Sequence, residues 1–520
     1  MDYVLALHSH LPWVLHHGKW PHGSDWLTEA AVDTYLPLIG TLRGLRHDNI
    51  PSPLTIGFTP VLANQLSHPS FHADLEAFFA QRLEACDEAG RVFAGGYDQH
   101  LAPLVNWWRD RLNRLRNLYH SLDGGILGAF RDLENSGQIE IIGGAATHGF
   151  LPLLATDASI RLQLNLGRGE HWRLFGKSPA GCWLPECAYR PKGWWAPLPE
   201  APANMRLGIE EFLSQAGFSY FFADGHMPLR GETPYRSWRV ASPNPAAQVD
   251  VLLRDPVASA QVWSREGGYP GDGRYLEFHK MRYPGGLKLW RVTGNRIDLG
   301  DKQPYHADAA HAAAFEQANH FLGLLHRIAH AQTNDTVVVT PFDTELFGHW
   351  WFEGPEFLNE VYRAFARAHG LRATSASQHL ASHYRGVAAL RAGSWGAGGD
   401  WSVWLSEKTA WTWRRLWPIE MDFWRVAGPA LREPGTRTIV EQAARELLLA
   451  QGSDWQFIIT GGDAADYAQR RFTHHCDDAA RLIAALQSGN TEMGLNQAAE
   501  IKQRDDLFPD ILPHIQGALQ

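Results

Sequence analysis

The stretch TVVVTPFDTE, residues 336–345, joins an unbroken apolar run to two carboxylic acids that follow it directly. Short runs of β-branched residues are typical of strands that are buried on both faces, as the strands of parallel sheets are. The strand would end at Thr340, and Asp343 would stand just beyond its C-terminal end. The stretch therefore predicts a parallel sheet that carries an acidic group at one edge.

Six similar runs precede it, and helical sequence separates several of them. The runs are Tyr3–His8, Leu54–Thr59, Ile139–Ile142, Gly181–Leu184, Tyr220–Phe222 and Leu287–Val292. The helical stretches are Ala30–His47, Ser159–Phe175, Ile209–Ala216 and Ala307–Gln332. Strands that alternate with helices predict βαβ units and an α/β fold, with a parallel sheet that is either open or closed into a barrel.

Two regions depart from this alternation. Residues 68–120 read as a helical insertion, and from residue 395 onward the pattern is helical throughout. We therefore predict a catalytic domain at 1–394, with the insertion inside it, and a C-terminal α-helical domain at 395–520. Its predicted helices are Lys408–Val426, Ile439–Gln451, Ala464–Ser488 and Glu492–Gln503. The segment 225–273 is rich in Pro and Gly, and loops of such length usually serve as functional lids.

Composition excludes several classes of protein. The formal net charge of -9 argues against nucleic-acid binding, which requires a basic surface. No run of eighteen apolar residues is present, so we expect no membrane span, and Asp2 stands where a signal peptide would carry Lys or Arg. Four cysteines (Cys86, Cys182, Cys187 and Cys476) lack paired ligand spacing, which favours a reduced, cytoplasmic protein.

Nearly every predicted strand is followed by side chains capable of chemistry. These are His8 and His10, His148, Glu186, Asp224, and Asp343. In parallel βα barrels the active site lies at the C-terminal ends of the strands, so these side chains would converge. Polar residues also begin ordinary loops, but that reading does not readily explain two acids placed directly beyond buried strands. Burying unpaired carboxylates is costly.

Two facing carboxylates are the groups that glycosyl transfer requires. One attacks the anomeric carbon while the other protonates the departing oxygen. Each disfavours ionisation of the other, which keeps one protonated near neutral pH. A separation of about 5–5.5 Å would indicate retention of configuration through a covalent intermediate.

The histidines allow two interpretations. We expect one of His8 and His10 to point into the barrel and the other towards the helices. With an Asp they could ligate a metal, as in a deacetylase, but no tight ligand triad is visible in the sequence. The favoured interpretation is that one binds a substrate hydroxyl and the other caps a loop.

The chain is also rich in aromatic residues, with 22 Trp, 24 Phe and 14 Tyr. Many of these must fill the core. Several stand instead in polar, Gly-rich stretches, such as HHGKWPHGSDW (16–26) and GSWGAGGDWSVW (393–404). Exposed aromatic rings mark binding surfaces, so a subset that includes Trp26 is predicted to contact a sugar.

Four blocks of the chain resemble the ordered signature blocks of glycoside hydrolase family 57. They are HSHLPW (8–13), GGAATHGFLPLL (143–154), WLPECAY (183–189) and TPFDTELFGHWWFEG (340–354). The resemblance implies a distorted (β/α)₇ barrel with a small helical insertion and a C-terminal α-helical domain. It also implies that Glu186 is the nucleophile and Asp343 the acid/base.

Within that family the chain is most similar to the branching enzymes. The stretches that match are RDP (254–256), QVWS (261–264), GYPGD (268–272) and SDW (453–455). Residues that this resemblance assigns to glucan binding are Arg254, Trp263, Gly271, Trp404, Trp413 and Asp454. Tyr235 is the expected lid tyrosine. Asp463 stands where those enzymes commonly have a sugar-contacting glutamine, and Gln456 replaces a usual proline.

The resemblance implies a retaining transglycosylase that cleaves α-1,4 linkages and forms α-1,6 branches in amylose, amylopectin or glycogen, with neither metal nor organic cofactor. It sets no oligomeric state. The nearest alternative is a 4-α-glucanotransferase or α-amylase with the same two carboxylates. More distant alternatives are a metal-dependent polysaccharide deacetylase that uses His8 and His10, and a non-catalytic glucan-binding protein.

Overall fold

A closed barrel of seven parallel strands lies at the centre of the molecule. The computed structural model describes residues 1–198, 201–264, 267–294, 296–332 and 336–520. The strands follow the order β1-β2-β3-β4-β7-β9-β10, and β10 closes the barrel by pairing with β1. Their bounds are Asp2–Ser9, Leu54–Phe58, Ile139–Gly144, Gly181–Trp183, Tyr220–Asp224, Asp250–Arg254 and Val337–Asp343. The predicted seven-stranded α/β barrel is confirmed.

Six of the seven predicted strands are barrel strands, and one is wrong. Residues 287–292 form only isolated bridges, among them Arg282 with Leu287 and Leu276 with Arg291. The missing strand is β9, which lies inside the segment 225–273 that was predicted as a lid. That segment also holds β8 (Trp238–Val240), which runs antiparallel to β9, so the prediction of one long lid is wrong. Residues 265 and 266 of that segment lie outside the described residues.

Helices cover the outside of the barrel. The predicted helix Ala30–His47 is part of a continuous stretch formed by α1 (Ser24–Ala30), the π-helix η1 (Ala31–Tyr35) and α2 (Leu36–His47). The other helices packed around the strands are α3 (Pro60–Leu66), α6 (Gly125–Asn135), α7 (Asp157–Phe175), α8 (Ile209–Gln215), α9 (Pro256–Trp263), α10 (Ala307–His330), α11 (Gly354–Phe365) and α12 (Ala376–Ser382).

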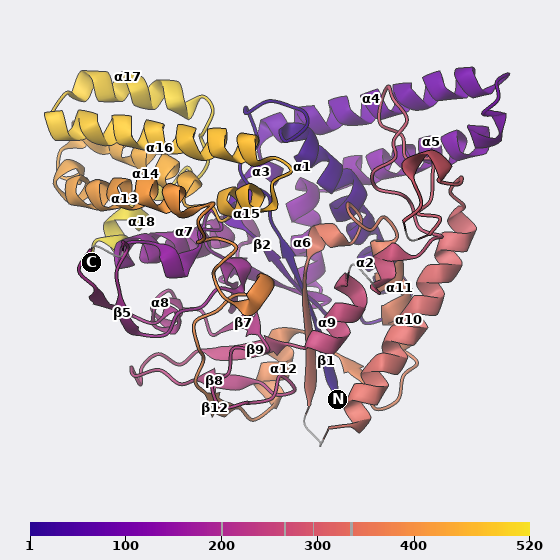
Figure 1. Cartoon of the computed structure of the whole chain (residues 1–520), viewed down its shortest axis with the longest axis horizontal. Coiled ribbons are helices and arrows are strands. Elements are labelled where there is room, and N and C mark those ends of the chain that lie inside the picture. The colour runs from indigo at the N-terminus through magenta and orange to yellow at the C-terminus, as the bar shows by residue number, and fades with distance from the viewer. Residues whose placement is uncertain (199–200, 265–266, 295, 333–335) are drawn as a thin grey trace.

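The two predicted helical regions lie on different sides of the barrel (Figure 1). Helices α4 (Pro69–Phe93) and α5 (Ala102–His120) form an antiparallel pair at the upper right of that view. The C-terminal helices gather at the upper left. They are α13 (Ala410–Leu431), α14 (Arg437–Ala450), α15 (Asp454–Gly461), α16 (Ala465–Ser488), α17 (Thr491–Lys502) and α18 (Ile511–Ala518). The four helices predicted there are observed, and α15 and α18 are additional.

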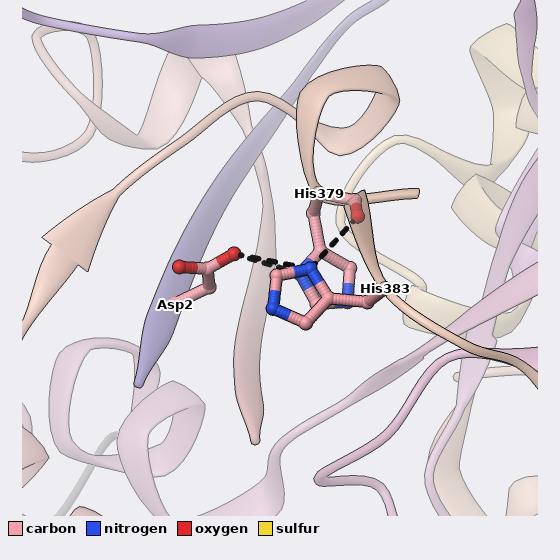
Figure 2. Close-up of side chains that lie close together, drawn as sticks. All are labelled: Asp2, His379 and His383. Atoms are coloured by element: carbon pink, nitrogen blue, oxygen red, sulfur yellow. Dashed lines mark hydrogen bonds and ion pairs between the residues drawn. The ribbon is translucent and has the colours of Figure 1, made fainter. Parts of the chain in front are cut away.

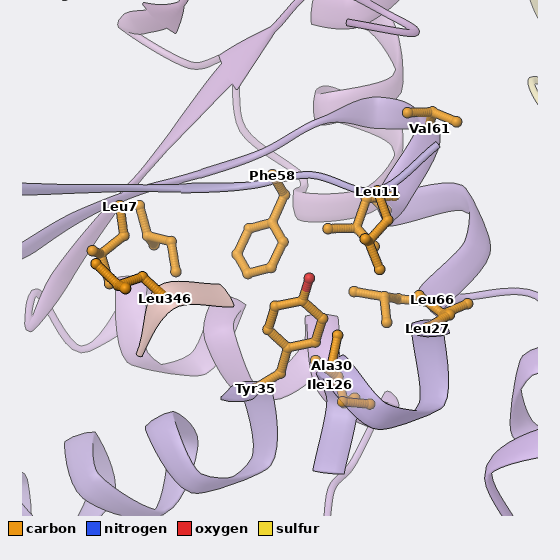
Figure 3. Close-up of a cluster of buried hydrophobic side chains, with 14 of the residues drawn as sticks. Leu7, Leu11, Leu27, Ala30, Tyr35, Phe58, Val61, Leu66, Ile126 and Leu346 are labelled. Atoms are coloured by element: carbon orange, nitrogen blue, oxygen red, sulfur yellow. The ribbon is translucent and has the colours of Figure 1, made fainter. Parts of the chain in front are cut away.

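Apolar packing fixes the first strands against the helices beside them. Figure 3 shows Leu7 of β1 and Phe58 of β2 facing Tyr35 of η1, together with Leu346 from the segment after β10. All four side chains are buried. The Tyr35 hydroxyl donates a hydrogen bond to Glu345, which ties this core to the acids that follow β10. Packing therefore sets the position of the C-terminal strand ends.

The opposite end of β1 is held by ion pairs (Figure 2). Arg372 donates two hydrogen bonds of 2.8 Å to the carboxylate of Asp2, and His379 Nδ1 lies 2.9 Å from Asp2 Oδ2. The His383 ring stacks on that of His379 with centroids 4.3 Å apart. Burial alone would raise the pKa of Asp2, but the hydrogen bonds from His379 and Arg372 bring it far below the usual range.

The sequence also carried predictions about membrane spans and disulfide bonds. Across the described ranges, no helix is both long and apolar enough to cross a membrane. All four cysteines are buried free thiols.

Candidate active site

Glu186 lies directly after β4 and is held by two hydrogen-bond donors. The indole Nε1 of Trp395 donates to its Oε2 at 2.9 Å, and the hydroxyl of Ser453 donates to its Oε1 at 2.8 Å. The backbone N–H of Trp395 also donates to the Glu186 carbonyl at 3.0 Å. The carboxylate is therefore fixed by one residue that follows the barrel and one from the start of α15.

The backbone at Glu186 adopts an unusual conformation. Glu186 has φ 60° and ψ 23°, and the next residue, Cys187, has φ 48°. His148, which contacts the same site, has φ 57°. Non-glycine residues in this left-handed region cost about 1–3 kcal/mol each and cluster at functional sites. The chain thus bears strain at two of the loops that carry predicted site residues.

Asp343 is the last residue of β10, where it pairs in register with His8 of β1. Within the part of the chain that the structure describes, no hydrogen bond reaches its carboxyl group. Its neighbour Thr344 accepts a hydrogen bond of 2.8 Å from Ser9, which fixes the backbone beside it. Glu186 and Asp343 therefore lie in contrasting surroundings, the first with two donors and the second with none.

Glu186 affects the ionisation of Asp343. Burial raises the pKa of Asp343 well above its usual value, and the negative charges of Glu345 and Glu186 raise it further. Burial also raises the pKa of Glu186 above its usual value, although the hydrogen bonds from Trp395 and Ser453 oppose that effect. The arrangement favours a protonated Asp343 beside an ionised Glu186, as the division of roles between acid and nucleophile requires.

The three histidines predicted from the strand ends gather in one stack. The His10 and His148 rings lie 4.0 Å apart, and the His8 ring lies 4.8 Å from that of His148. The expectation that His8 and His10 point in opposite directions is wrong, because residues two apart along a strand share a face. The His8 ring also stacks on Trp183, with centroids 4.6 Å apart.

Each histidine is oriented by a polar partner. His10 contacts Thr59 through Nδ1 at 2.9 Å and Asp454 through Nε2 at 2.9 Å. His148 contacts Ser453 through Nδ1 at 2.8 Å and His8 through Nε2 at 2.9 Å. Burial lowers the pKa of both His8 and His148, so these two rings are neutral. Neutral imidazoles can donate to or accept from sugar hydroxyls.

The same residues meet the spacing of a metal site. Ligand atoms of His10, His148 and Asp454 lie within 4.8 Å of one another. A triad of this kind can bind zinc. In this structure His10 Nε2 bonds to Asp454, and His148 bonds to Ser453 and to His8. The favoured interpretation, in which one histidine binds a substrate hydroxyl and the other caps a loop, stays a prediction.

Arg254 and Asp224 form an ion pair at the ends of β9 and β7. His226 Nδ1 lies 2.9 Å from the other Asp224 oxygen. The charges of Arg254, Asp224, Glu186 and Asp343 all act on the thiol of Cys187, whose pKa is raised chiefly by burial. Arg254 therefore pairs with Asp224, one of the residues that the sequence placed at the strand ends.

The predicted aromatic contacts have different positions. Trp404 and Trp413 are buried, and the Trp413 indole donates to the Trp404 carbonyl at 2.7 Å. Neither presents an open ring face, so in this structure both pack inside the molecule. Trp26 is half-buried in α1, beside the His22 ring at 6.4 Å. Because the His22 ring lies 5.3 Å from Tyr467 of α16, Trp26 stands near the C-terminal helices.

No described interaction joins four of the predicted residues to Glu186 or its partners. The backbone carbonyl of Tyr235 accepts from Val337, the first residue of β10, so Tyr235 stands near the N-terminal end of that strand. The prediction of a lid tyrosine at this position is wrong. Trp263, Gly271 and Asp463 are exposed, and no described interaction joins them to the residues around Glu186.

Trp395 and Ser453 are site residues that the sequence did not single out. Both stand in stretches already marked, GSWGAGGDWSVW and SDW. The signal was therefore present, but it pointed to the aromatic rings and to Asp454. The contact of Ser453 with Glu186 spans 267 positions of the chain, and no local pattern reports such a distance.

Comparisons with known proteins agree with this arrangement. The model of glycosyl hydrolase family 57 matches residues 4–388, and the model described as 1,4-alpha-glucan branching enzyme, C-terminal, matches residues 425–515. A 1,4-alpha-glucan branching enzyme from Thermococcus kodakarensis is 36% identical over 537 residues, which cover 98% of this chain and 77% of that protein.

Two solved structures are similar over the whole chain. The branching enzyme of this family from Pyrococcus horikoshii has a TM-score of 0.92 at 34% identity, with 100% of this chain and 97% of that chain covered. The α-amylase AmyC from Thermotoga maritima has a TM-score of 0.83 at 28% identity, with 100% and 99% covered.

Proposed function

Because the chain belongs to glycosyl hydrolase family 57, we propose that it is a retaining 1,4-α-glucan branching enzyme with Glu186 as nucleophile and Asp343 as acid/base. The observation that carries the proposal is the contrast between these two acids. Two hydrogen bonds hold Glu186 in place, while Asp343, whose carboxyl group receives no hydrogen bond from the described residues, has a strongly raised pKa. An ionised nucleophile and a protonated acid are the pair that glycosyl transfer uses.

In the first step the α-1,4 bond of a glucan chain breaks. An oxygen of Glu186 attacks the anomeric carbon, and the proton of Asp343 passes to the departing 4-oxygen. The products are a glycosyl ester on Glu186 and a shortened glucan with a free 4-hydroxyl. Asp343 is left as a carboxylate, now ready to accept a proton.

In the second step a 6-hydroxyl of another glucose unit attacks the ester carbon. Asp343 accepts the hydroxyl proton, the bond to Glu186 breaks, and an α-1,6 linkage forms. Two inversions give net retention of configuration. Water in place of the sugar hydroxyl would give hydrolysis, so branching requires that the acceptor position exclude water.

We propose that the histidine cluster and its neighbours bind the sugar hydroxyls. His10, His148, Asp454 and Arg254 offer both donors and acceptors close to Glu186. We keep Trp26 as an aromatic candidate for a sugar contact. The predicted sugar contacts of Trp263, Gly271 and Asp463 would lie outside this cluster.

The partners follow from the same assignment. We propose amylose, amylopectin and glycogen as substrates, and a cytoplasmic location that is supported by the four free thiols. We keep 1–394 and 395–520 as the catalytic and helical domains. The second domain supplies Ser453 and Asp454 to the site, so both would be needed for activity.

The test is product analysis on amylose with wild-type protein and Glu186→Gln. The wild type should yield α-1,6 linkages, detected as chains released by a debranching enzyme, together with a fall in iodine staining. Glu186→Gln removes the nucleophile and should reduce both signals by at least about a thousandfold.

A rival reading is favoured by one specific observation, the similarity to the α-amylase AmyC over the whole chain. An amylase with the same acids would lower iodine staining and release reducing ends without new branch points. That outcome would leave the two acids in their roles and exclude the branching activity. Turnover that survives in Glu186→Gln would exclude the mechanism itself.

A further inference from the structure

We propose that Ser453 is a positioning residue for Glu186, as the last donor in a hydrogen-bond chain that starts at His8 and passes through His148. The links are His8 Nε2 to His148 Nε2 at 2.9 Å, His148 Nδ1 to Ser453 Oγ at 2.8 Å, and Ser453 Oγ to Glu186 Oε1 at 2.8 Å. The role depends on the proposed function, because it treats Glu186 as the nucleophile.

Elementary hydrogen-bond chemistry fixes the direction of this chain. An ionised carboxylate only accepts, so the single hydroxyl proton of Ser453 must point to Glu186. The Ser453 oxygen must then accept from an N–H at Nδ1 of His148. A neutral imidazole with its proton on Nδ1 has a lone pair on Nε2, so His8 must donate from its own Nε2. With Glu186 ionised, only one placement of the protons therefore satisfies all three hydrogen bonds.

The reverse direction of this hydrogen-bond chain differs at His8, the residue farthest from Glu186. If Glu186 were protonated and donated to Ser453, each link would turn and His8 would carry its proton on Nδ1. That nitrogen is buried, and no partner for it exists among the described residues. The reverse chain would therefore bury an unsatisfied N–H donor at His8 Nδ1, whereas the forward chain leaves an unsatisfied lone pair there. The forward chain is the one that an ionised Glu186 requires.

The backbone holds Ser453 rigidly in this role. Its N–H donates to the His148 carbonyl at 3.0 Å, and Gly452 forms an antiparallel bridge with Gly149. A Cβ atom at Gly452 would come within 3.3 Å of the Thr147 carbonyl oxygen, so the two segments meet at backbone contact distance. The C-terminal helical region thus delivers the hydroxyl on a segment that is joined to the loop carrying His148.

Other charged and titratable groups also face Glu186, and an experiment must separate their effects. Asp454 and His10 act on it from α15 and from the end of β1, and Glu186 itself raises the pKa of Asp343 at the end of β10. His148 Nδ1 lies 3.8 Å from Oε1. Arg254 and Asp224 pair with each other, and both act on the thiol of Cys187. A change at Ser453 keeps all of these residues in the chain, but Ser453→Ala also removes the partner of His148 Nδ1, which Ser453→Thr retains.

The experiment compares Ser453→Ala, Ser453→Thr and Ser453→Cys, with Ser406→Ala as the matched control. Ser406 lies in the same C-terminal region but bonds to Thr409. The substrate is α-maltosyl fluoride, because fluoride departs without a proton and the rate of its release therefore reports on nucleophilic attack. Initial rates are measured across pH.

Ser453→Ala should lower kcat by about ten- to a hundredfold with KM within twofold, since it removes one hydrogen bond to a charged group. It should also move the acidic limb of the kcat/KM profile upward by about one pH unit, because the lost donor had stabilised the carboxylate. Ser453→Thr retains the hydroxyl and should restore both values. Ser453→Cys, with a weak donor of similar size, should be intermediate.

An acidic limb that stays in place in Ser453→Ala, with circular dichroism unchanged, would overturn the positioning role. If that variant fails to fold, the same comparison is made between Ser453→Cys and the wild type. Branch formation on amylose is scored separately in the wild type. If the wild type forms no branches but the acidic limb of Ser453→Ala shifts, only the proposed acceptor is wrong. If the wild type forms branches but that limb does not shift, only the role of Ser453 is wrong.

Discussion

The two ends of the barrel treat buried charge in opposite ways, although the same strand, β1, reaches both. At the N-terminal end, Asp2 is matched by Arg372 and His379, and its pKa is lowered. At the C-terminal end, β10 places Asp343 next to two further carboxylates, and its pKa is raised. The first arrangement stabilises the charged form, and the second destabilises it.

The charge at Asp2 therefore serves the stability of the fold, and the raised pKa of Asp343 serves its chemistry. A matched charge strengthens the folded state, whereas a mismatched pair of acids costs stability and supplies a proton donor near neutral pH. Barrel enzymes commonly divide these tasks between their two faces. Substitutions at the two ends should therefore affect different measurements.

The largest effect is expected for Asp343→Asn, which removes the proton donor. Branching on amylose should fall by about 10²–10⁴-fold, the usual contribution of general acid–base catalysis. Fluoride release from α-maltosyl fluoride should fall much less, because fluoride needs no protonation. Comparable losses with both substrates would show that Asp343 is not the acid.

A smaller effect is expected for Glu345→Gln, which retains the hydrogen bond from Tyr35 but removes a charge. Burial raises the pKa of Glu345 to about 7, so it is ionised on the alkaline side. Without that charge the pKa of Asp343 falls, and Asp343 loses its proton at lower pH. The alkaline limb of kcat should move to lower pH, with about three- to tenfold less activity there. A limb that moves upward would contradict this coupling.

Asp2→Asn should change stability and leave catalysis intact. Losing a matched carboxylate should lower the free energy of unfolding by about 1–3 kcal/mol at neutral pH. The pKa of Asp2 is lower in the folded than in the unfolded chain, so its contribution is complete above about pH 4 and fades as the medium becomes more acidic. Thermal unfolding of both proteins should therefore converge in acid. A change in kcat beyond twofold would break the division between the two ends.

The smallest effect is expected for Tyr235→Phe. This tyrosine bonds to Asp255, and burial together with that carboxylate raises its pKa to about 12. Loss of the hydroxyl should cost about 0.5–1.5 kcal/mol of stability. Branching activity should stay within twofold, and a large fall in kcat would restore the lid assignment that the structure contradicts.

Sequence pattern predicted the parallel sheet because six of its strands are apolar runs of the kind that parallel strands require, and the family resemblance predicted that the sheet closes into a barrel. The pattern failed at Asp250–Arg254, since a five-residue run between Pro- and Gly-rich segments resembles a loop. At 287–292 the pattern predicted a strand that the structure does not contain. Alternate apolar residues there pack against the insertion without joining the sheet. Pairing, and not local pattern, decides such cases.

The residues of the candidate site also include some that the sequence could predict and some that it could not. Residues at the ends of strands, such as His8, Glu186 and Asp343, could be predicted because parallel strands bring their C-terminal ends together. Ser453 and Trp395 could not, because their roles come from tertiary contacts with Glu186. Trp404, in the stretch GSWGAGGDWSVW, was misleading for a related reason. A polar, Gly-rich setting in the sequence does not reveal that a ring is buried.

The bond between Ser453 and Glu186 also has a consequence for biosynthesis. At roughly 5–20 residues per second, a ribosome needs tens of seconds to add the 267 residues that separate the two. Strands β7, β9 and β10 are added within that interval, so from Asp343 to Ser453 a complete barrel would hold Glu186 without this donor. Full activity would therefore arise only after translation has passed the SDW stretch.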